Sequence, residues 1–225
     1  MEHVMTEPRL AEQLAAEVKP RLRGWLHAAT VPLALVGGLL LIGYAPTALG
    51  KVGAVVYLIC SLLLFGNSAV YHRGRWKPAA KAMLRRIDHA NIFLFIAASY
   101  TPLTLLLLDG SSRTALLVLI WSAAVLGVLF RVFWLSAPRW LYVVLYLAMG
   151  WAAVGWLPQF WANGGPLVVG LVGLGGVLYS AGAIAYALKR PNPFPAWYGF
   201  HEVFHTCTIL AAFSHFAAIA LATFR

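Results

Sequence analysis

Residues 52–72 read VGAVVYLICSLLLFGNSAVYH and contain no Lys, Arg, Asp or Glu. About 20 consecutive apolar residues are the length that an α-helix needs to cross the hydrocarbon core of a bilayer. Near its end the run carries Ser68 and His72, which are four residues apart and therefore share one face of the predicted helix. The segment predicts a membrane-spanning helix with a polar pair at one end.

The rest of the chain repeats this apolar pattern. Its 225 residues are 61% hydrophobic and 11% charged, with a mean hydropathy of +0.78. Soluble domains have roughly a quarter charged residues. A chain with so few charges and so many apolar side chains cannot bury them all in one soluble core, so we expect lipid to surround it. The fold class predicted is all-α, a polytopic membrane protein with seven transmembrane helices; six is the alternative, because the break at Asp109–Arg113 is short. The seven spans are placed at residues 24–45, 52–72, 87–108, 114–134, 140–160, 165–188 and 198–222.

Two segments are expected, a cytoplasmic N-terminal segment at 1–23 and a transmembrane domain at 24–225. Within the first, residues 6–19 predict a short amphipathic helix, because apolar side chains recur every four residues. The recurring side chains are Leu10, Leu14 and Val18. Pro20 then ends this helix. The first twenty-odd residues are polar and charged, so no cleavable signal peptide is expected among them.

The basic residues indicate how the chain is oriented in the membrane. With the N-terminus inside, 14 of the 17 Lys and Arg residues fall on inner segments and 3 on outer ones. This bias predicts a cytoplasmic N-terminus and an external C-terminus, the reverse of a G-protein-coupled receptor. The net charge of +10 therefore serves orientation, and no nucleic-acid partner is expected.

Ionisable side chains inside spans are the functional candidates, because each charged one costs about 2.5 kcal/mol or more on insertion scales. In the predicted topology, the inner ends of the second, third and seventh spans carry such groups. They are His72, Asp88, and His201 with His205, and the polar Ser68 lies one turn before His72. Three spans therefore bring polar side chains to one leaflet.

The histidines predict a metal site. His201 and His205 are one helical turn apart, a spacing that lets two imidazoles hold one ion, and His72 is the third ligand. Three histidines leave a fourth zinc position for water, as in catalytic sites. Asp88 is the nearest carboxylate by depth and can hold or deprotonate that water. The alternative is that the histidines only form hydrogen bonds between helices.

Other polar residues are assigned lesser roles. His215 lies about 21 Å of helix rise beyond His201, too far to share its ion, and we place it on the same inner seam. Glu202, about 100° from His201, is expected to pair with a basic loop residue. His89 lies about 100° from Asp88 and has no assigned role. His27, at the inner end of the first span, is a candidate fourth ligand.

Three stretches carry a family resemblance: NSAVYH at 67–72, RRIDHANIFLFIAASYTPLTL at 85–105 and HEVFHTCTILAAFSHF at 201–216. Together they resemble the hemolysin III family, the bacterial branch of the progestin and adipoQ receptor superfamily. The family's ordered pattern is Ser-xxx-His ending the second span, Asp opening the third with Ser/Thr-Tyr-Thr-Pro further on, and His-xxx-His in the last span. All of these occur here in order.

The resemblance implies a seven-helix fold with the N-terminus inside. It also implies Zn²⁺ held by His72, His201 and His205, with Asp88 holding the zinc water. Ser68 would hydrogen-bond near the site or support the oxyanion. The adiponectin-receptor relatives are linked to hydrolysis of lipid amides. The bacterial branch is named for lysis of red cells and is associated with membrane homeostasis.

Three functions compete at this stage. The first is a zinc-dependent hydrolase of a lipid amide or ester, with Asp88 and Ser68 as catalytic residues. The second is a membrane-homeostasis sensor or receptor-like protein with structural zinc, and the third is a hemolytic pore. In the first two the expected partner is a membrane lipid, and the expected location is the bacterial plasma membrane. The sequence leaves the oligomeric state open.

Overall fold

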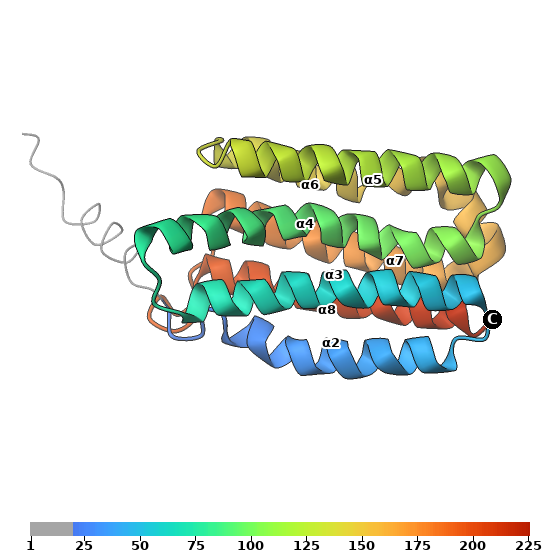
Figure 1. Ribbon diagram of the computed structural model, residues 1–225, viewed down its shortest axis with the longest axis horizontal. Helices are drawn as coiled ribbons and strands as arrows, with labels where there is room; N and C mark the ends of the chain where they lie inside the picture. The colour runs from blue at the N-terminus through green and yellow to red at the C-terminus, as the bar shows by residue number, and fades with distance from the viewer. Residues whose placement is uncertain (1–19) are drawn as a thin grey trace, which may run out of the picture.

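The structure, a computed structural model, describes residues 20–225, so the predicted amphipathic helix at 6–19 lies outside the described residues. The described part of the chain is a bundle of helices without a β-sheet (Figure 1). The α-helices are α2 (Trp25–Tyr44), α3 (Ala48–Arg73), α4 (Pro78–Leu107), α5 (Gly110–Phe133), α6 (Arg139–Gly150), α7 (Leu157–Leu188) and α8 (Phe200–Thr223). A short 3-10 helix, η1 (Ala152–Trp156), joins α6 to α7.

Six helices among residues 20–225 are long and apolar enough to cross a membrane, rather than the seven predicted. The fifth and sixth predicted spans belong to one helical run of 50 residues, Arg139–Leu188. The loop expected at residues 163–166 is instead a kink within α7. Gly165 takes a φ of 74° there, a left-handed conformation open to a residue without Cβ, and the next helix resumes at once with Pro166.

The run Arg139–Leu188 doubles back on itself. The Arg139 guanidinium donates to the backbone carbonyl of Tyr186 at 3.1 Å. The Trp151 indole N–H donates to the Ser180 hydroxyl at 3.0 Å. Residues far apart in the run therefore face each other, and its first part lies antiparallel to most of α7.

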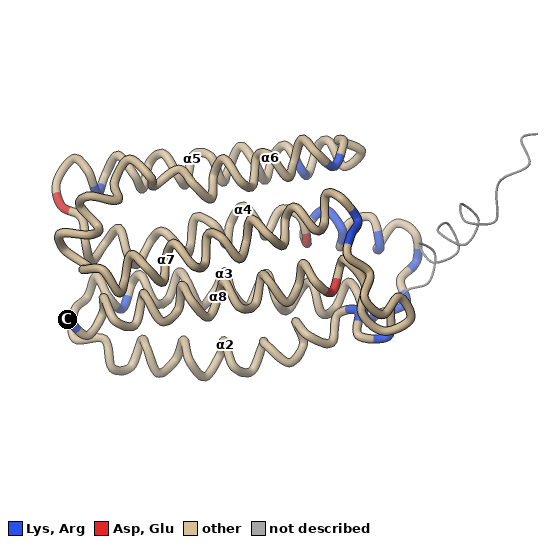
Figure 2. Tube along the Cα trace, turned by 180° about the vertical axis from the view of Figure 1, so that it is seen from behind, with Lys and Arg blue, Asp and Glu red and all other residues tan. Residues whose placement is uncertain are grey.

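The two ends of the described chain lie at opposite ends of the bundle. At one end, the Arg21 backbone N–H donates to the Ala196 carbonyl at 3.0 Å. At the other, the Arg225 guanidinium donates to the Asn163 carbonyl at 2.9 Å. Figure 2 shows that Lys and Arg gather at the end where α2 begins, which is the end predicted to be cytoplasmic.

Helix α4 begins earlier than the predicted third span, at Pro78 rather than at residue 87. Most of the basic stretch expected to be a loop is therefore helical. Proline suits the first position of a helix, and the Ala and Lys residues that follow favour helix wherever lipid does not decide. As a result Asp88 lies about 15 Å along α4 from its start rather than in its first turn.

Helix α4 is the central helix of the bundle, because 72% of its most apolar window is buried, against 50% or less in the other five candidate spans. Close approach to its neighbours depends on glycines. A Cβ on Gly53 of α3 would lie 2.7 Å from Pro102, and one on Gly127 of α5 would lie 2.3 Å from the Phe93 ring. Small residues at such contacts let helices pack closely in lipid.

We expect Gly127→Ala to destabilise the protein. The added methyl group collides with Phe93 and should cost about 1–3 kcal/mol, more than the ~1 kcal/mol that alanine gains in a helix. Thermal unfolding in detergent measures the change. Gly170→Ala in α7 is the matched control, because a Cβ there meets nothing within 4 Å. Equal effects of the two substitutions would contradict this packing.

Candidate metal centre

Three histidines from two helices meet at the charged end of the bundle. His72 lies in the last turn of α3, and His201 and His205 lie in the first two turns of α8. One ring nitrogen from each falls within 4.8 Å of the other two. The Nε2 atoms of His72 and His201 are 3.2 Å apart. The structure thus brings together the three residues that the sequence picked out as ligands.

The spacing of these nitrogens fits a metal ion. Zinc bound at about 2.0–2.1 Å with tetrahedral angles would hold two nitrogens about 3.3 Å apart, close to the separation of His72 and His201. The three ring planes are tilted by 62° to 74° from one another, so the rings do not stack. A set of three imidazoles suits zinc and several other transition metals.

Asp88 lies next to the histidines without belonging to their cluster. Its Oδ2 atom is 3.7 Å from the Nε2 atom of His72, which is beyond hydrogen-bond distance. Ser68, one turn before His72 on α3, lines the same cavity as Asp88. Ser68 is buried, whereas the Asp88 side chain keeps 12% of its surface exposed. The carboxylate therefore lies beside the histidines and stays partly open.

The start of α8 is fixed by Glu202, a fully buried carboxylate. Its Oε2 atom accepts the Gly199 backbone N–H at 2.9 Å, which caps the helix. Its other oxygen accepts a hydrogen bond from the Arg23 guanidinium, just before α2. The prediction that Glu202 pairs with a basic loop residue is confirmed. Because His201 and His205 flank Glu202, this ion pair also fixes the metal candidates.

His27 of α2 reaches the cluster through its ring face rather than a nitrogen. Its ring stacks on His205 with centroids 3.8 Å apart and planes 12° apart, and it meets Phe65 edge-on. Both of its nitrogens are buried without a hydrogen-bond partner. His27 is not in the group of three nitrogens found among the described residues. The packing therefore does not place His27 as a fourth ligand.

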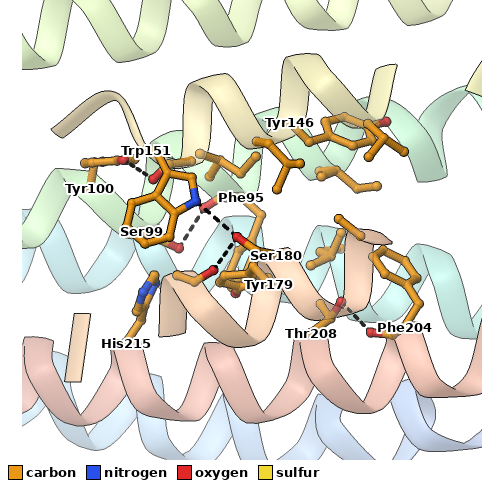
Figure 3. A pocket seen from close by; sticks show the side chains of 18 of the residues that line it. Phe95, Ser99, Tyr100, Tyr146, Trp151, Tyr179, Ser180, Phe204, Thr208 and His215 are labelled. Carbon is orange, nitrogen blue, oxygen red and sulfur yellow. Dashed lines mark hydrogen bonds between the residues drawn. The ribbon is translucent and has the colours of Figure 1, made fainter. Parts of the chain in front are cut away.

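A largely apolar cavity of about 230 Å³ begins beside the histidines. It is lined from Asp88 to Leu103 on α4, a rise of about 22 Å, and from His201 to His215 on α8. His215 thus lines the same cavity, as predicted. Figure 3 shows part of this cavity, with the His215 ring pointing from α8 toward Ser99 and Trp151.

The same residues are covered by a family comparison. The model for proteins described as "Haemolysin-III related" matches residues 16–216, which include every member of the site. The chain belongs to the haemolysin-III family. Its resemblance to that family, based on three motifs, is thereby shown over most of the chain.

Relatives of this haemolysin-III protein come from bacteria and animals. A hemolysin-3 homolog of Bacillus subtilis is 34% identical over 150 residues, covering 66% of this chain and 70% of the relative. Hemolysin-3 of Bacillus cereus is 30% identical over 68% of this chain and 70% of its own. The human monocyte to macrophage differentiation factor is 28% identical over 87% of this chain and 80% of its own.

One pair of residues in this haemolysin-III chain was missed by reasoning from sequence. The guanidinium of Arg131, in the last turn of α5, contacts Nδ1 of His89 on α4. Arg131 is fully buried, although the sequence analysis counts it as an inner orientation charge. Its position inside the apolar run GVLFRVF was the available signal, because a cation there needs a specific partner.

Proposed function

We propose that this membrane protein is a zinc-dependent hydrolase of a lipid amide or ester. The observation that carries the proposal is one juxtaposition. Three histidine nitrogens lie within 4.8 Å of one another, with the Asp88 carboxylate beside them, at the end of an apolar cavity inside the bundle. A water-soluble substrate would not need an apolar cavity of this kind.

The cavity indicates the class of substrate. Most of its lining is aliphatic or aromatic, including Leu64, Ile92, Phe95, Leu103 and Phe160. Its extent of about 22 Å along α4 suits an extended acyl chain. A chain lying there would place its carbonyl group at the polar end, near Asp88 and His201. This arrangement favours a long-chain acyl amide or ester.

The chain's own residues supply the proton transfers of such a hydrolysis. Zinc, when bound, would polarise the carbonyl oxygen and lower the pKa of water to about 7. Asp88 accepts a proton from the attacking water as the new C–O bond forms. It returns that proton to the leaving nitrogen or oxygen as the old bond breaks, which yields a fatty acid and an amine or alcohol. Ser68 lies with Asp88 at this end of the cavity, where its hydroxyl can donate to the carboxylate or to the developing oxyanion.

A lipid panel with metal control tests this function. The purified protein is incubated in mixed micelles with a ceramide, a simple fatty acid amide and a phospholipid, and released fatty acid is measured. We expect release from an acyl amide or ester, loss of release after chelation, and recovery with added zinc. Absence of release from all three lipids by the zinc-loaded protein would contradict a hydrolase.

A sensor with structural zinc is the second candidate. The observation that favours it is that the three histidines tie α3 to α8, while His27 adds α2 through its stack on His205. Chelation would then lower the unfolding temperature, and no lipid would be hydrolysed. Leakage from liposomes in the same preparation would instead favour the lytic pore.

We also propose that the metal centre faces the cytoplasm of a bacterial cell. The basic residues gather at that end of the bundle, and the positive-inside rule places them in the cytoplasm. Alkaline phosphatase fused after Arg225 should therefore be active, and the same enzyme fused after Arg190 should be inactive. Activities in the reverse order would contradict this orientation.

A further inference from the structure

The cavity has a second polar group close to Asp88, and the metal centre does not use it. His89 follows Asp88 on α4 and is one of the residues that line the cavity. The ring packs against Tyr142 of α6, with centroids 5.6 Å apart. The His89 backbone carbonyl accepts the Tyr146 hydroxyl at 3.1 Å. Contacts from α6 therefore hold this residue in one position.

The contact with Arg131 determines where the proton of His89 lies. The guanidinium touches the Nδ1 atom of His89. Arginine has only N–H donors and no acceptor, so Nδ1 must offer a lone pair. A neutral imidazole with a lone pair on Nδ1 carries its proton on Nε2. Arg131 thus selects one tautomer of His89.

Arg131 is buried and is held by contacts with several residues. It is 0% exposed, its guanidinium carbon lies 4.5 Å from the centroid of the Tyr142 ring, and it also donates to the Trp134 carbonyl at 3.4 Å. No ion pair among residues 20–225 includes it. A buried cation without a carboxylate is costly, although the C-terminal end of α5 offsets part of the cost. His89 is the side-chain acceptor that this cation has.

The Nε2–H group of His89 is left available to a ligand. No hydrogen bond joins Nε2 to another described residue, and Nε2 is not among the polar atoms enclosed by packing. Asp88 and His89 are about 100° apart around α4 and both line the cavity, so the two side chains approach it from different directions. A fixed N–H donor there is complementary to an acceptor oxygen.

We propose that His89 donates a hydrogen bond from Nε2 to the carbonyl oxygen of the acyl lipid in the cavity. Its role in turnover rests on the proposed hydrolase, but its tautomer and its binding of a carbonyl group need neither metal nor reaction. Removing one such donor in other enzymes costs about 10²–10³ in kcat. His89→Phe should therefore lower turnover in that range with the zinc content unchanged.

Nitrogen NMR of histidine-labelled, metal-free protein in detergent tests the tautomer. We expect the proton of His89 on Nε2 in the native protein and a mixture of tautomers in Arg131→Met. A proton on Nδ1 in the native protein would overturn the proposal. The spectra of the native protein and of Arg131→Met can be recorded without turnover. If the protein hydrolyses no lipid, the proposed hydrolase function is refuted, but the tautomer can still be tested.

Binding of two uncharged probes tests the donor. The probes are 2-heptadecanone and heptadecane, which have the same chain length and differ in one carbonyl oxygen. The native metal-free protein should bind the ketone about fivefold more tightly, the value of one net hydrogen bond. His89→Phe should lose this preference, and His89→Gln, which retains an N–H donor, should keep most of it.

An unchanged preference in His89→Phe would refute the donor role. If that variant does not fold, Arg131→Met serves instead, because a mixture of tautomers should weaken the preference. An unchanged preference in Arg131→Met would then refute the proposal. Tyr57→Phe is the control for a lost buried hydroxyl outside the cavity, since Tyr57 donates to the Ala212 carbonyl at 2.9 Å.

Discussion

Replacing Asp88 with Asn is expected to lower the kcat of lipid hydrolysis by about 10²–10⁴-fold, the usual contribution of a general acid–base group. The amide keeps the shape of the side chain but cannot take up the proton of the attacking water. Because Asp88 is outside the group of three nitrogens, the zinc content should stay at the native level. Initial rates and metal analysis on the same preparation check both expectations.

Asp109→Asn is the matched control for this change. Asp109 lies between the end of α4 and the start of α5, at the other end of α4 from its basic start, is exposed, and pairs with Arg113 at 2.9 Å. The same chemical substitution there should leave kcat unchanged. Native turnover in Asp88→Asn would refute the proposed role of the carboxylate. Loss of zinc in that variant would show instead that Asp88 is a ligand.

His205→Ala is expected to have the largest effect on metal binding. Losing a group that merely supports a ligand costs 10–100-fold in metal affinity, so losing one of three ligands should cost more than roughly 100-fold. Competition with a chromogenic chelator measures the affinity. The native protein should also lose thermal stability on chelation, by up to about 4 kcal/mol when zinc is at 1,000 times its Kd, whereas the variant should not respond.

His215→Ala tests whether this loss is specific to the cluster. His215 is on the same helix and lines the same cavity, but its Nε2 atom lies 3.2 Å from the Val172 carbonyl and it is outside the group of three. The zinc affinity of His215→Ala should equal that of the native protein. Equal zinc in His205→Ala and the native protein would remove the basis of the proposed function.

The helical elements and the convergence of the candidates were predictable from the sequence. Apolar run lengths located the helices, and the distribution of Lys and Arg ordered their ends. Alternating direction then placed His72, Asp88, His201 and His205 at one end, where the structure has them. These inferences succeed because a helix in lipid must satisfy its own backbone and present apolar side chains, which are local properties.

Two errors in the fold share one cause. The turn residues at 163–166 predicted a loop, but the chain turns sharply at Gly165 and the helix resumes at Pro166. The basic stretch before residue 87 predicted another loop, but most of it is helical. Turn and charge signals report where the chain leaves the apolar run. They do not report whether the helix ends there, since helix propensity and a single left-handed glycine let it continue.

By itself, the sequence determined that this protein is a bundle of apolar helices with a histidine cluster at its charged end. Only the tertiary structure decided how His27 and His89 take part. His27 stacks on His205 because α2 packs against α8, and His89 meets Arg131 because α4 packs against α5. Helix spacing predicts which side chains share a face, but the partner on the facing helix depends on packing between segments far apart in the chain.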